Sequence, residues 1–405
     1  MRLLIGGSPC THWSIAQTKN RETEASGIGW ELFLNYRIAR GKYKPDYFLY
    51  ENNKSMSPAI RTQITAELGV EPVLINSALV SAQNRQRLYW VGKREPDGTY
   101  SQVPVEQPED RGILLRDILE TGICWREKGY ALTASSHSAT AEDMFARRQR
   151  NGVAEPIDAC CVAQRGRYIG EGGKVAQHFE ARTDGKTNTL TTVEKDNLVA
   201  EPVRIGTIEN DAKTPDHDSQ QYRVYSPDGK SVTLCGNGGG LGAKTGLYAT
   251  PIGGIDGKAG PVYEVRDGFI AIKGKRYPIK LRDGFYIIRK LTVTECKRLQ
   301  TVPEEYVFPV SNSQAYKMLG NGWTVDVIAH IMSHFEGLTE EPVEVLSMYD
   351  GMSCGHIALD KLGAEITAYY ATEIDKYAIQ TTQHNFPKTI QLGDAFQVRG
   401  EGWTL

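Results

Sequence analysis

Short apolar runs alternate with amphipathic stretches at both ends of this chain, and this alternation restricts the possible folds more than any other feature. The apolar runs are residues 3–5, 47–50, 72–76, 88–92, 343–348 and 366–372. The amphipathic stretches include residues 57–68 and 325–335. Strands that alternate with helices build a mostly parallel sheet covered by helices. The two ends of the chain are therefore predicted to form a doubly wound α/β domain.

The middle of the chain has a different composition. Residues 116–288 are rich in Gly, Thr, Asn and Asp, and contain the turn dipeptides Asp184-Gly185, Asp228-Gly229, Asp267-Gly268 and Asp283-Gly284. Such residues are typical of short strands joined by turns and loops. We expect an inserted β and loop-rich region here, with a hairpin over 262–289. The predicted parts are 1–115, 116–288 and 289–405.

Composition sets mild limits on function. The 405 residues carry a net charge of −2, and no apolar run is long enough to span a membrane. Seven scattered cysteines show no zinc-ligand spacing, so we expect no metal site and a cytoplasmic, reducing environment. The stretch 273–298 holds nine Lys or Arg against two acids. It suits either a solvated face or one that contacts phosphates.

Cys10 ends the run Leu3-Leu4-Ile5-Gly6-Gly7-Ser8-Pro9-Cys10, in which an apolar strand breaks into a glycine turn. The carboxyl ends of parallel strands are where α/β enzymes place reacting groups. A thiol at that place is a candidate nucleophile. The alternative is a small buried apolar side chain, the usual state of a single cysteine.

A second strand end carries the pattern of a nucleotide site. The apolar run 343–348 leads into Tyr349-Asp350-Gly351-Met352-Ser353-Cys354-Gly355 and an expected helix, and the next strand ends at Glu373. A carboxylate about 20 residues after such a turn is placed to accept hydrogen bonds from ribose hydroxyls. The turn is not the dinucleotide Gly-x-Gly-x-x-Gly. It therefore favours a nucleoside without pyrophosphate, such as S-adenosylmethionine.

Together these segments resemble the cytosine-5 DNA methyltransferase family. The matching motifs are Gly-Gly-Ser-Pro-Cys ending at Cys10, Glu51-Asn52, Gln83-x-Arg85-x-Arg87, the segment 289–300, Gly320-Asn321, and the cofactor motifs at 349–355 and Asp394. Ser8 and Asp350-Gly351 are most similar to the branch that contains the eukaryotic de novo enzymes and some phage or bacterial relatives. The resemblance covers both α/β parts. The segment 116–288 falls where the family places its variable target-recognition region.

The order of the motifs departs from most of the family, in which the cofactor motifs precede the Pro-Cys motif. Here the Pro-Cys motif comes first and the cofactor motifs come last, so the chain resembles a circular permutation of the family's order. Such a permutation is tolerated when the joined ends lie close together on the surface. We therefore expect Leu405 near Met1, and residues 336–342 as a surface linker.

The resemblance implies a role for each catalytic residue. Cys10 would add as a thiolate to carbon 6 of cytosine, which makes carbon 5 nucleophilic. Glu51, carrying or sharing a proton, would donate to ring N3. Arg87 would hold the ring O2, and Arg85 would brace the loop or a phosphate. A structural salt bridge is the alternative for Glu51 and the arginines. Carbon 5 is out of reach in a stacked duplex, so the base would be flipped out.

The resemblance also implies the cofactor and the partners. The cofactor would be S-adenosylmethionine and the partner double-stranded DNA, with a restriction nuclease as an open further partner. Two other functions stay open from the sequence, a catalytically silent DNA-binding relative and an RNA cytosine-5 methyltransferase. For Asp394 a helix cap, and for Tyr349 a place in the core, are the alternatives. The residues expected at the cofactor are Tyr349, Asp350, Gly351, Ser353, Gly355, Glu373, Ile374, Asp394 and Asn321.

Overall fold

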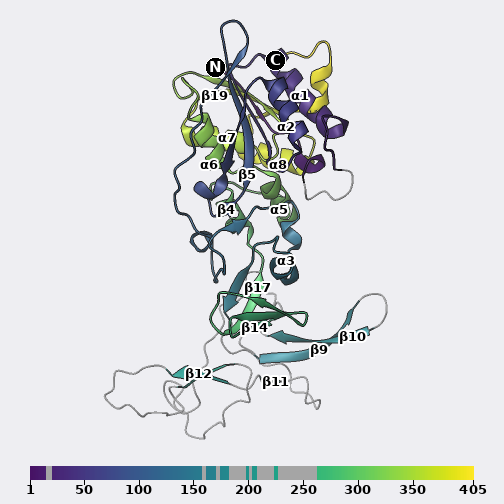
Figure 1. Ribbon diagram of the computed structural model, residues 1–405, viewed down its shortest axis with the longest axis vertical. Coiled ribbons are helices and arrows are strands. Elements are labelled where there is room, and N and C mark those ends of the chain that lie inside the picture. Colours follow the sequence, from purple (N-terminus) through teal and green to yellow (C-terminus); the bar gives the residue numbers. More distant parts are fainter. Residues whose placement is uncertain are drawn as a thin grey trace, which may run out of the picture. The chain divides into compact units, whose positions relative to one another are not determined.

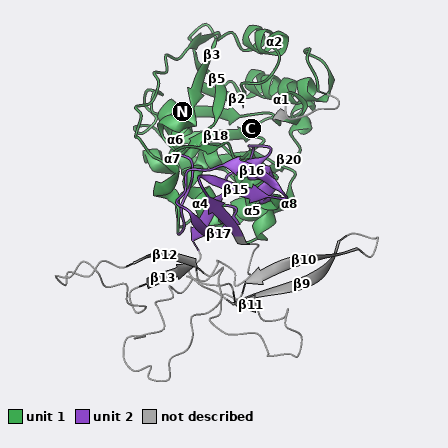
Figure 2. Cartoon of the chain, turned by 60° about the horizontal axis from the view of Figure 1, so that its bottom comes forward, with its two compact units in different colours: residues 1–120, 127–138, 291–405 green, residues 121–126, 139–290 purple. Residues whose placement is uncertain are grey.

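The computed structural model describes residues 1–14, 21–156, 161–169, 174–181, 198–199, 203–207, 223–226 and 262–405. The side chains of Cys10, of Val262 and of the strands between 161 and 226 lie outside the described part. The chain divides into two compact units, coloured separately in Figure 2. Unit 1 comprises residues 1–120, 127–138 and 291–405, and unit 2 comprises residues 121–126 and 139–290.

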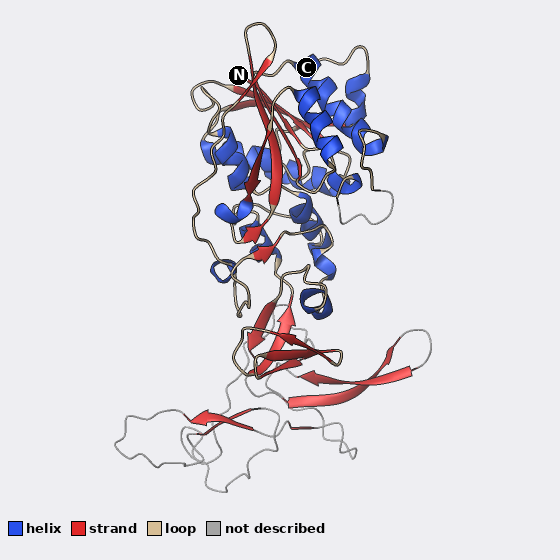
Figure 3. Ribbon diagram, viewed as in Figure 1, coloured by secondary structure: helices blue, strands red, loops and turns tan. Residues whose placement is uncertain are grey.

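Unit 1 is built on an eight-stranded sheet with helices around it (Figures 1 and 3). The strand order is β20-β19-β18-β1-β2-β5-β3, with β6 paired to β5. The strands are β1 Arg2–Gly6, β2 Tyr47–Asn53, β3 Pro72–Asn76, β5 Gln86–Arg94, β6 Tyr100–Gln102, β18 Val343–Met348, β19 Ile366–Thr372 and β20 Ile390–Gly393. The helices are α1 Gly27–Tyr43, α2 Pro58–Leu68, α4 Val293–Leu299, α5 Asn312–Asn321, α6 Val325–Met332, α7 Cys354–Leu362 and α8 Lys376–Asn385.

The expected α/β fold is confirmed, and most predicted strands and helices are present. One difference concerns β5, which runs antiparallel between β2 and β3. Only nine residues, 77–85, join β3 to β5. A parallel connection needs a crossover of a dozen or more residues, so this link can make only an antiparallel pair. The sheet is therefore parallel from β20 to β2 and antiparallel at the other edge.

The local sequence explains where α2 begins and ends. Ser57 precedes the helix and accepts a hydrogen bond from the backbone N–H of Ile60 (3.3 Å), and Pro58 occupies the first turn, where a missing N–H costs nothing. Gly69 ends the helix with φ +75°, a conformation that glycine adopts without strain.

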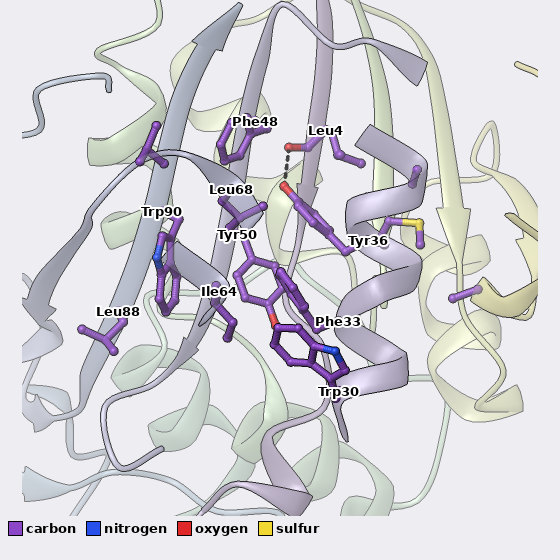
Figure 4. Close-up of a cluster of buried hydrophobic side chains, with 14 of the residues drawn as sticks. Leu4, Trp30, Phe33, Tyr36, Phe48, Tyr50, Ile64, Leu68, Leu88 and Trp90 are labelled. Carbon is purple, nitrogen blue, oxygen red and sulfur yellow. Dashed lines mark hydrogen bonds between the residues drawn. The ribbon is translucent and has the colours of Figure 1, made fainter. Parts of the chain in front are cut away.

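One face of the sheet packs against α1 and α2 through a cluster of large apolar side chains (Figure 4). Leu4 of β1 points into this cluster, where the Tyr36 hydroxyl donates to its carbonyl oxygen (3.3 Å). The next residue, Ile5, lies against α7 on the other face, since a Cβ at Gly355 would be 2.2 Å from Ile5 Cδ1. Both faces of β1 are thus buried, which explains its continuous apolar sequence.

The two ends of the chain lie near each other in both views (Figures 1 and 2). The Met1 amino group donates to the carbonyl of Pro342 (2.8 Å), in the segment expected to be a linker. Trp403 and Leu405 pack against the cluster that holds Leu4. This adjacency lets β1 occupy a central position although its sequence stands first.

Unit 2 contains a five-stranded antiparallel sheet of order β16-β15-β14-β17-β8, together with the short helix α3 Ala141–Phe145. Its strands are β8 Val153–Pro156, β14 Val262–Arg266, β15 Phe269–Ile272, β16 Lys275–Pro278 and β17 Gly284–Arg289. The segment expected as one hairpin thus forms four strands. Asp267 and Gly268 both have positive φ, as a two-residue hairpin turn requires. No helix in the described part of either unit is long and apolar enough to cross a membrane.

Candidate active site

The strand order of unit 1 places two loops side by side. Along the chain, β18 is followed by β19 and β20 on one side of it, while β1 and β2 lie on the other side. The parallel register pairs Gly6 of β1 with Met348 of β18, so the segments 7–10 and 349–353 leave adjacent strand ends. Doubly wound sheets bind ligands at the carboxyl ends of their strands, where the strand order reverses. The two segments singled out from the sequence meet at that point.

The loop after β1 is held by buried hydrogen bonds. Ser8 is 4% exposed, and its hydroxyl bonds to the Tyr50 hydroxyl at 2.6 Å. The Asn52 amide donates to the Ser8 carbonyl (3.1 Å) and to the Tyr50 hydroxyl (3.2 Å). Burial raises the pKa of Tyr50, so this hydroxyl stays neutral. These contacts fix the backbone two residues before Cys10, which begins the short helix η1 Cys10–His12.

Glu51 lies at the end of β2, next to the same loop. Its Oε1 forms an ion pair with Arg87 Nε (3.1 Å), and its Oε2 accepts a hydrogen bond from Trp323 Nε1 (2.9 Å). The Glu51 side chain is 12% exposed and that of Arg87 is 19% exposed. A Cβ at Gly7 would be 2.9 Å from Glu51 Oε2, so only glycine allows this approach. The carboxylate therefore lies against the loop that leads to Cys10.

Arg85 and Arg87 have different surroundings. Arg85 is 4% exposed and donates to the backbone carbonyls of Leu132 (3.0 Å), Gly320 (3.3 Å) and Gly322 (2.8 Å). It braces the turn that follows α5. Arg87 instead faces Glu51 and is partly open to solvent. Of the two arginines, Arg87 has the setting suited to a substrate atom.

The turn after β18 has unusual backbone conformations. Tyr349, Gly351 and Ser353 all have φ near +60°, which non-glycine residues rarely adopt. Glu373 holds the turn, because its carboxylate accepts the backbone N–H groups of Gly351 and Ile374, each at 2.8 Å. Strained backbone kept by such contacts is common at binding sites.

Asp350 supports this turn from inside the unit. Its side chain is half-buried and accepts hydrogen bonds from the Tyr369 hydroxyl (2.8 Å) and from Ser353 Oγ. Burial is the main cause that raises the pKa of Asp350. Gly355 permits α7 to pack closely on β1, because a Cβ there would collide with Ile5.

The remaining residues expected at the cofactor lie on neighbouring segments. Ile374 is 74% exposed, directly after Glu373. Asp394 accepts the N–H of Phe396 (2.9 Å) and caps the short helix η6 Ala395–Arg399. Tyr349 donates to the Leu32 carbonyl (2.7 Å) and packs at the edge of the apolar cluster. Asn321 is exposed at the end of α5.

Part of the basic stretch 273–298 serves the fold. Lys297 is 7% exposed and donates to the carbonyl of Tyr306 (2.9 Å), and burial lowers its pKa. Arg289 forms an ion pair with Glu155 (2.7 Å). The charges of these two residues are therefore used within the protein, and the choice between a solvated and a phosphate-contacting face concerns the other basic residues of the stretch.

Two residues of this site, Trp323 and Tyr50, are not indicated by the sequence. Trp323 lies 272 residues from Glu51 in the chain, and no local pattern indicates such a pairing. Tyr50 sits in an apolar strand and gave no signal beyond its hydrophobicity. Its hydroxyl contact with Ser8 depends on the pairing of β1 with β2.

Comparisons with known proteins relate this chain to methyltransferases of phage and bacteria. A family model described as C-5 cytosine-specific DNA methylase matches residues 1–336. The orphan methyltransferase M.SPRI of Bacillus phage SPR is 26% identical over 388 residues, which are 81% of this chain and 81% of that protein. The type II methyltransferase M.HhaI of Haemophilus parahaemolyticus is 28% identical over 148 residues, 36% of this chain and 33% of that protein. The solved structure of the Entamoeba histolytica methyltransferase EhMeth aligns at 13% identity with a TM-score of 0.34, over 82% of this chain and 76% of that one.

Proposed function

The chain belongs to the C-5 cytosine-specific DNA methylase family, and we propose that it methylates cytosine in double-stranded DNA through a covalent bond between Cys10 and carbon 6 of the base. The protein is a DNA methyltransferase, and S-adenosylmethionine is its methyl donor. The observation that carries the residue assignment is the meeting of three groups at one sheet edge. These are the loop to Cys10, the Glu51–Arg87 pair and the turn after β18.

The residues of the turn fit S-adenosylmethionine. A Cβ at Gly351 would meet no atom within 4 Å, so the turn leaves open space over its backbone. Ile374 offers an exposed apolar surface beside Glu373, which suits the face of an adenine ring. We assign the ribose hydroxyls to Glu373, the adenine to Ile374 and Asp394, and the methionine end to Asn321. Asp350, Ser353, Gly355 and Tyr349 shape the turn.

The reaction follows from the chemistry of these side chains. Carbon 5 of cytosine is a poor nucleophile, and addition of the Cys10 thiolate to carbon 6 makes it an enamine carbon. Glu51, when it carries or shares a proton, donates that proton to N3, and Arg87 holds O2, so both disperse the charge of this addition. S-adenosylmethionine supplies the methyl group as an electrophilic sulfonium. Carbon 5 then loses its proton to solvent and the thiolate is expelled. N3 returns its proton to Glu51, and the aromatic ring is restored.

We propose that the target base is flipped out of the duplex, because a stacked cytosine cannot receive a thiol at carbon 6.

The target-recognition region is proposed as residues 116–288. Within it, residues 127–138 belong to unit 1, and the rest of the described part from 121 onward belongs to unit 2. A restriction nuclease as partner stays a prediction from the resemblance.

The function is tested by transfer of a labelled methyl group from S-adenosylmethionine to double-stranded DNA, followed by bisulfite mapping. We expect label in DNA at cytosine carbon 5, and an equal amount of competing RNA should not reduce it. Label found only in RNA, or no label in DNA while S-adenosylmethionine binds, would contradict the proposal.

Removal of the Tyr50 hydroxyl tests the loop after β1. We expect Tyr50→Phe to lower the free energy of unfolding by about 1–2 kcal/mol, because the buried hydrogen bonds of this hydroxyl with Ser8 and Asn52 are lost. We also expect methyl transfer to slow by about tenfold, since the loop to Cys10 is less well fixed. Urea unfolding and initial rates measure the two effects.

Tyr43→Phe is the matched control, because the Tyr43 hydroxyl bonds to the Glu344 carbonyl (3.0 Å), away from the loop. It should lose a similar amount of stability and keep the wild-type rate. If both variants lose the same activity, the hydrogen bond of Ser8 has no special role.

A further inference from the structure

The Glu51 carboxylate accepts from two donors, one charged and one neutral. Arg87 Nε reaches Oε1 from β5 (3.1 Å), and Trp323 Nε1 reaches Oε2 from the turn between α5 and α6 (2.9 Å). In the proposed reaction Arg87 turns to the O2 atom of the base. Arg87 then divides its N–H donors between the base and Glu51, so it does not serve the carboxylate alone. The indole N–H is a single neutral donor with no other proposed task.

The backbone on both sides of Trp323 is clamped. The Gly322 carbonyl accepts hydrogen bonds from Arg85 Nη2 (2.8 Å) and Gln300 Nε2 (3.1 Å). Thr324 is 1% exposed, and its hydroxyl donates to Gln300 Oε1 (2.9 Å). An indole presented from a turn with so many partners has little freedom to move away from its acceptor.

The same turn touches the start of α7. A Cβ at Gly322 would lie 3.2 Å from Cys354 Sγ and 3.6 Å from Met352 Sδ. Burial raises the pKa of the Cys354 thiol to about 12, against the effect of the Trp323 backbone N–H, which bonds to its sulfur. Trp323 thus contacts the cofactor side of unit 1 with its backbone and Glu51 with its side chain.

We infer that Trp323 is a positioning residue for Glu51, which fixes one carboxylate oxygen while Arg87 and the other oxygen turn to the target base. The inference rests on the proposed role of Glu51. A carboxylate that is held at one oxygen has less freedom to rotate. Its other oxygen therefore points toward the place of the base before the base binds. Positioning of this kind raises the rate of the chemical step more than the affinity for substrate.

The first test needs no catalysis. In protein labelled with ¹⁵N-tryptophan, each of the six indole N–H groups gives one signal, and Trp323→Phe identifies the signal of Trp323. We expect Glu51→Gln to move this signal, because a charged acceptor is replaced by a neutral one. The signal of Trp90, which donates to Thr65 Oγ1 (3.0 Å), should stay in place. An unmoved Trp323 signal would overturn the inference whether or not the enzyme is active.

The second test is a double-mutant cycle under single-turnover conditions with Trp323→Phe, Glu51→Gln and the double variant. Trp323→Phe should lower the rate of methyl transfer by about 10- to 100-fold, the range for a hydrogen bond to a charged group. KM for S-adenosylmethionine and its affinity by calorimetry should change by less than about threefold. In the Glu51→Gln background the same substitution should have little further effect.

Trp90→Phe is the control for loss of an indole donor elsewhere in unit 1, and it should keep the wild-type rate. Equal losses from Trp323→Phe in both backgrounds would show that Trp323 does not act through Glu51 and would overturn the inference. If the wild-type protein methylates no DNA while the indole signal still moves, the proposed function is wrong, and the positioning role is wrong with it. If the protein methylates DNA and the indole signal stays in place, only the positioning role is wrong.

Discussion

Cys10→Ser abolishes methyl transfer to DNA in this account, with a loss on the order of 10⁴-fold or more. The hydroxyl of serine is a far weaker nucleophile than a thiolate and cannot add to carbon 6 at neutral pH. The side chain differs by one atom, so S-adenosylmethionine should bind as it does in the wild type. The measurement is labelled methyl transfer, with calorimetry of cofactor binding beside it.

Cys124→Ser is the matched control, because Cys124 lies in unit 2 and is partly exposed. At saturating DNA it should leave the rate unchanged within about twofold, because its place in the proposed target-recognition region affects only the affinity for DNA. Activity of Cys10→Ser close to that of the wild type would remove the nucleophile from the mechanism.

Gly320→Ala should have the largest effect on stability. In α5 a Cβ at this position would lie 2.1 Å from the carbonyl carbon of Thr133 and 2.3 Å from its oxygen. Backbone atoms cannot rotate away as a side chain can, so we expect a loss of about 3 kcal/mol in the free energy of unfolding. The displaced turn carries Asn321 and Trp323, so cofactor affinity and methyl transfer should fall as well.

Gly41→Ala supplies the opposite control. Gly41 lies in α1, and a Cβ there would meet no atom within 4 Å. Alanine favours the helix over glycine, so this variant should gain about 0.5–1 kcal/mol. Urea unfolding of both variants measures the change in the free energy of unfolding that each substitution causes. A Gly320→Ala protein as stable as the wild type would show that the contact with Thr133 can relax.

The sequence identified the strand ends but not all of their partners. Cys10, Glu51 and Glu373 could be placed because each follows a short apolar run, and the carboxyl ends of parallel strands meet at one edge. The direction of β5 was not predicted, although the shortness of the link 77–85 indicates an antiparallel pair. The parallel pairing of β1 with β18 brings together residues more than 300 positions apart, and the motif order alone indicated it.

The contacts within the site depend on tertiary structure in ways that no spacing reveals. Both Arg85 and Arg87 belong to one short motif, yet Arg85 is buried against backbone carbonyls and Arg87 faces Glu51. Glu373 was expected at the ribose, and its carboxylate also holds the N–H of Gly351. Residue type and position along a strand do not distinguish these surroundings, because folding determines which backbone groups come near.

The covalent bond between Cys10 and carbon 6 can be trapped on a modified base. Cytosine that carries fluorine at carbon 5 has no proton to lose after methyl transfer, so an attached thiol stays bound to carbon 6. With S-adenosylmethionine and a double-stranded DNA containing this base at a methylated site, peptide mass spectrometry should find the modified nucleotide on Cys10. An adduct on another residue, or efficient methylation of ordinary DNA with no adduct on the fluorinated DNA, would contradict the account.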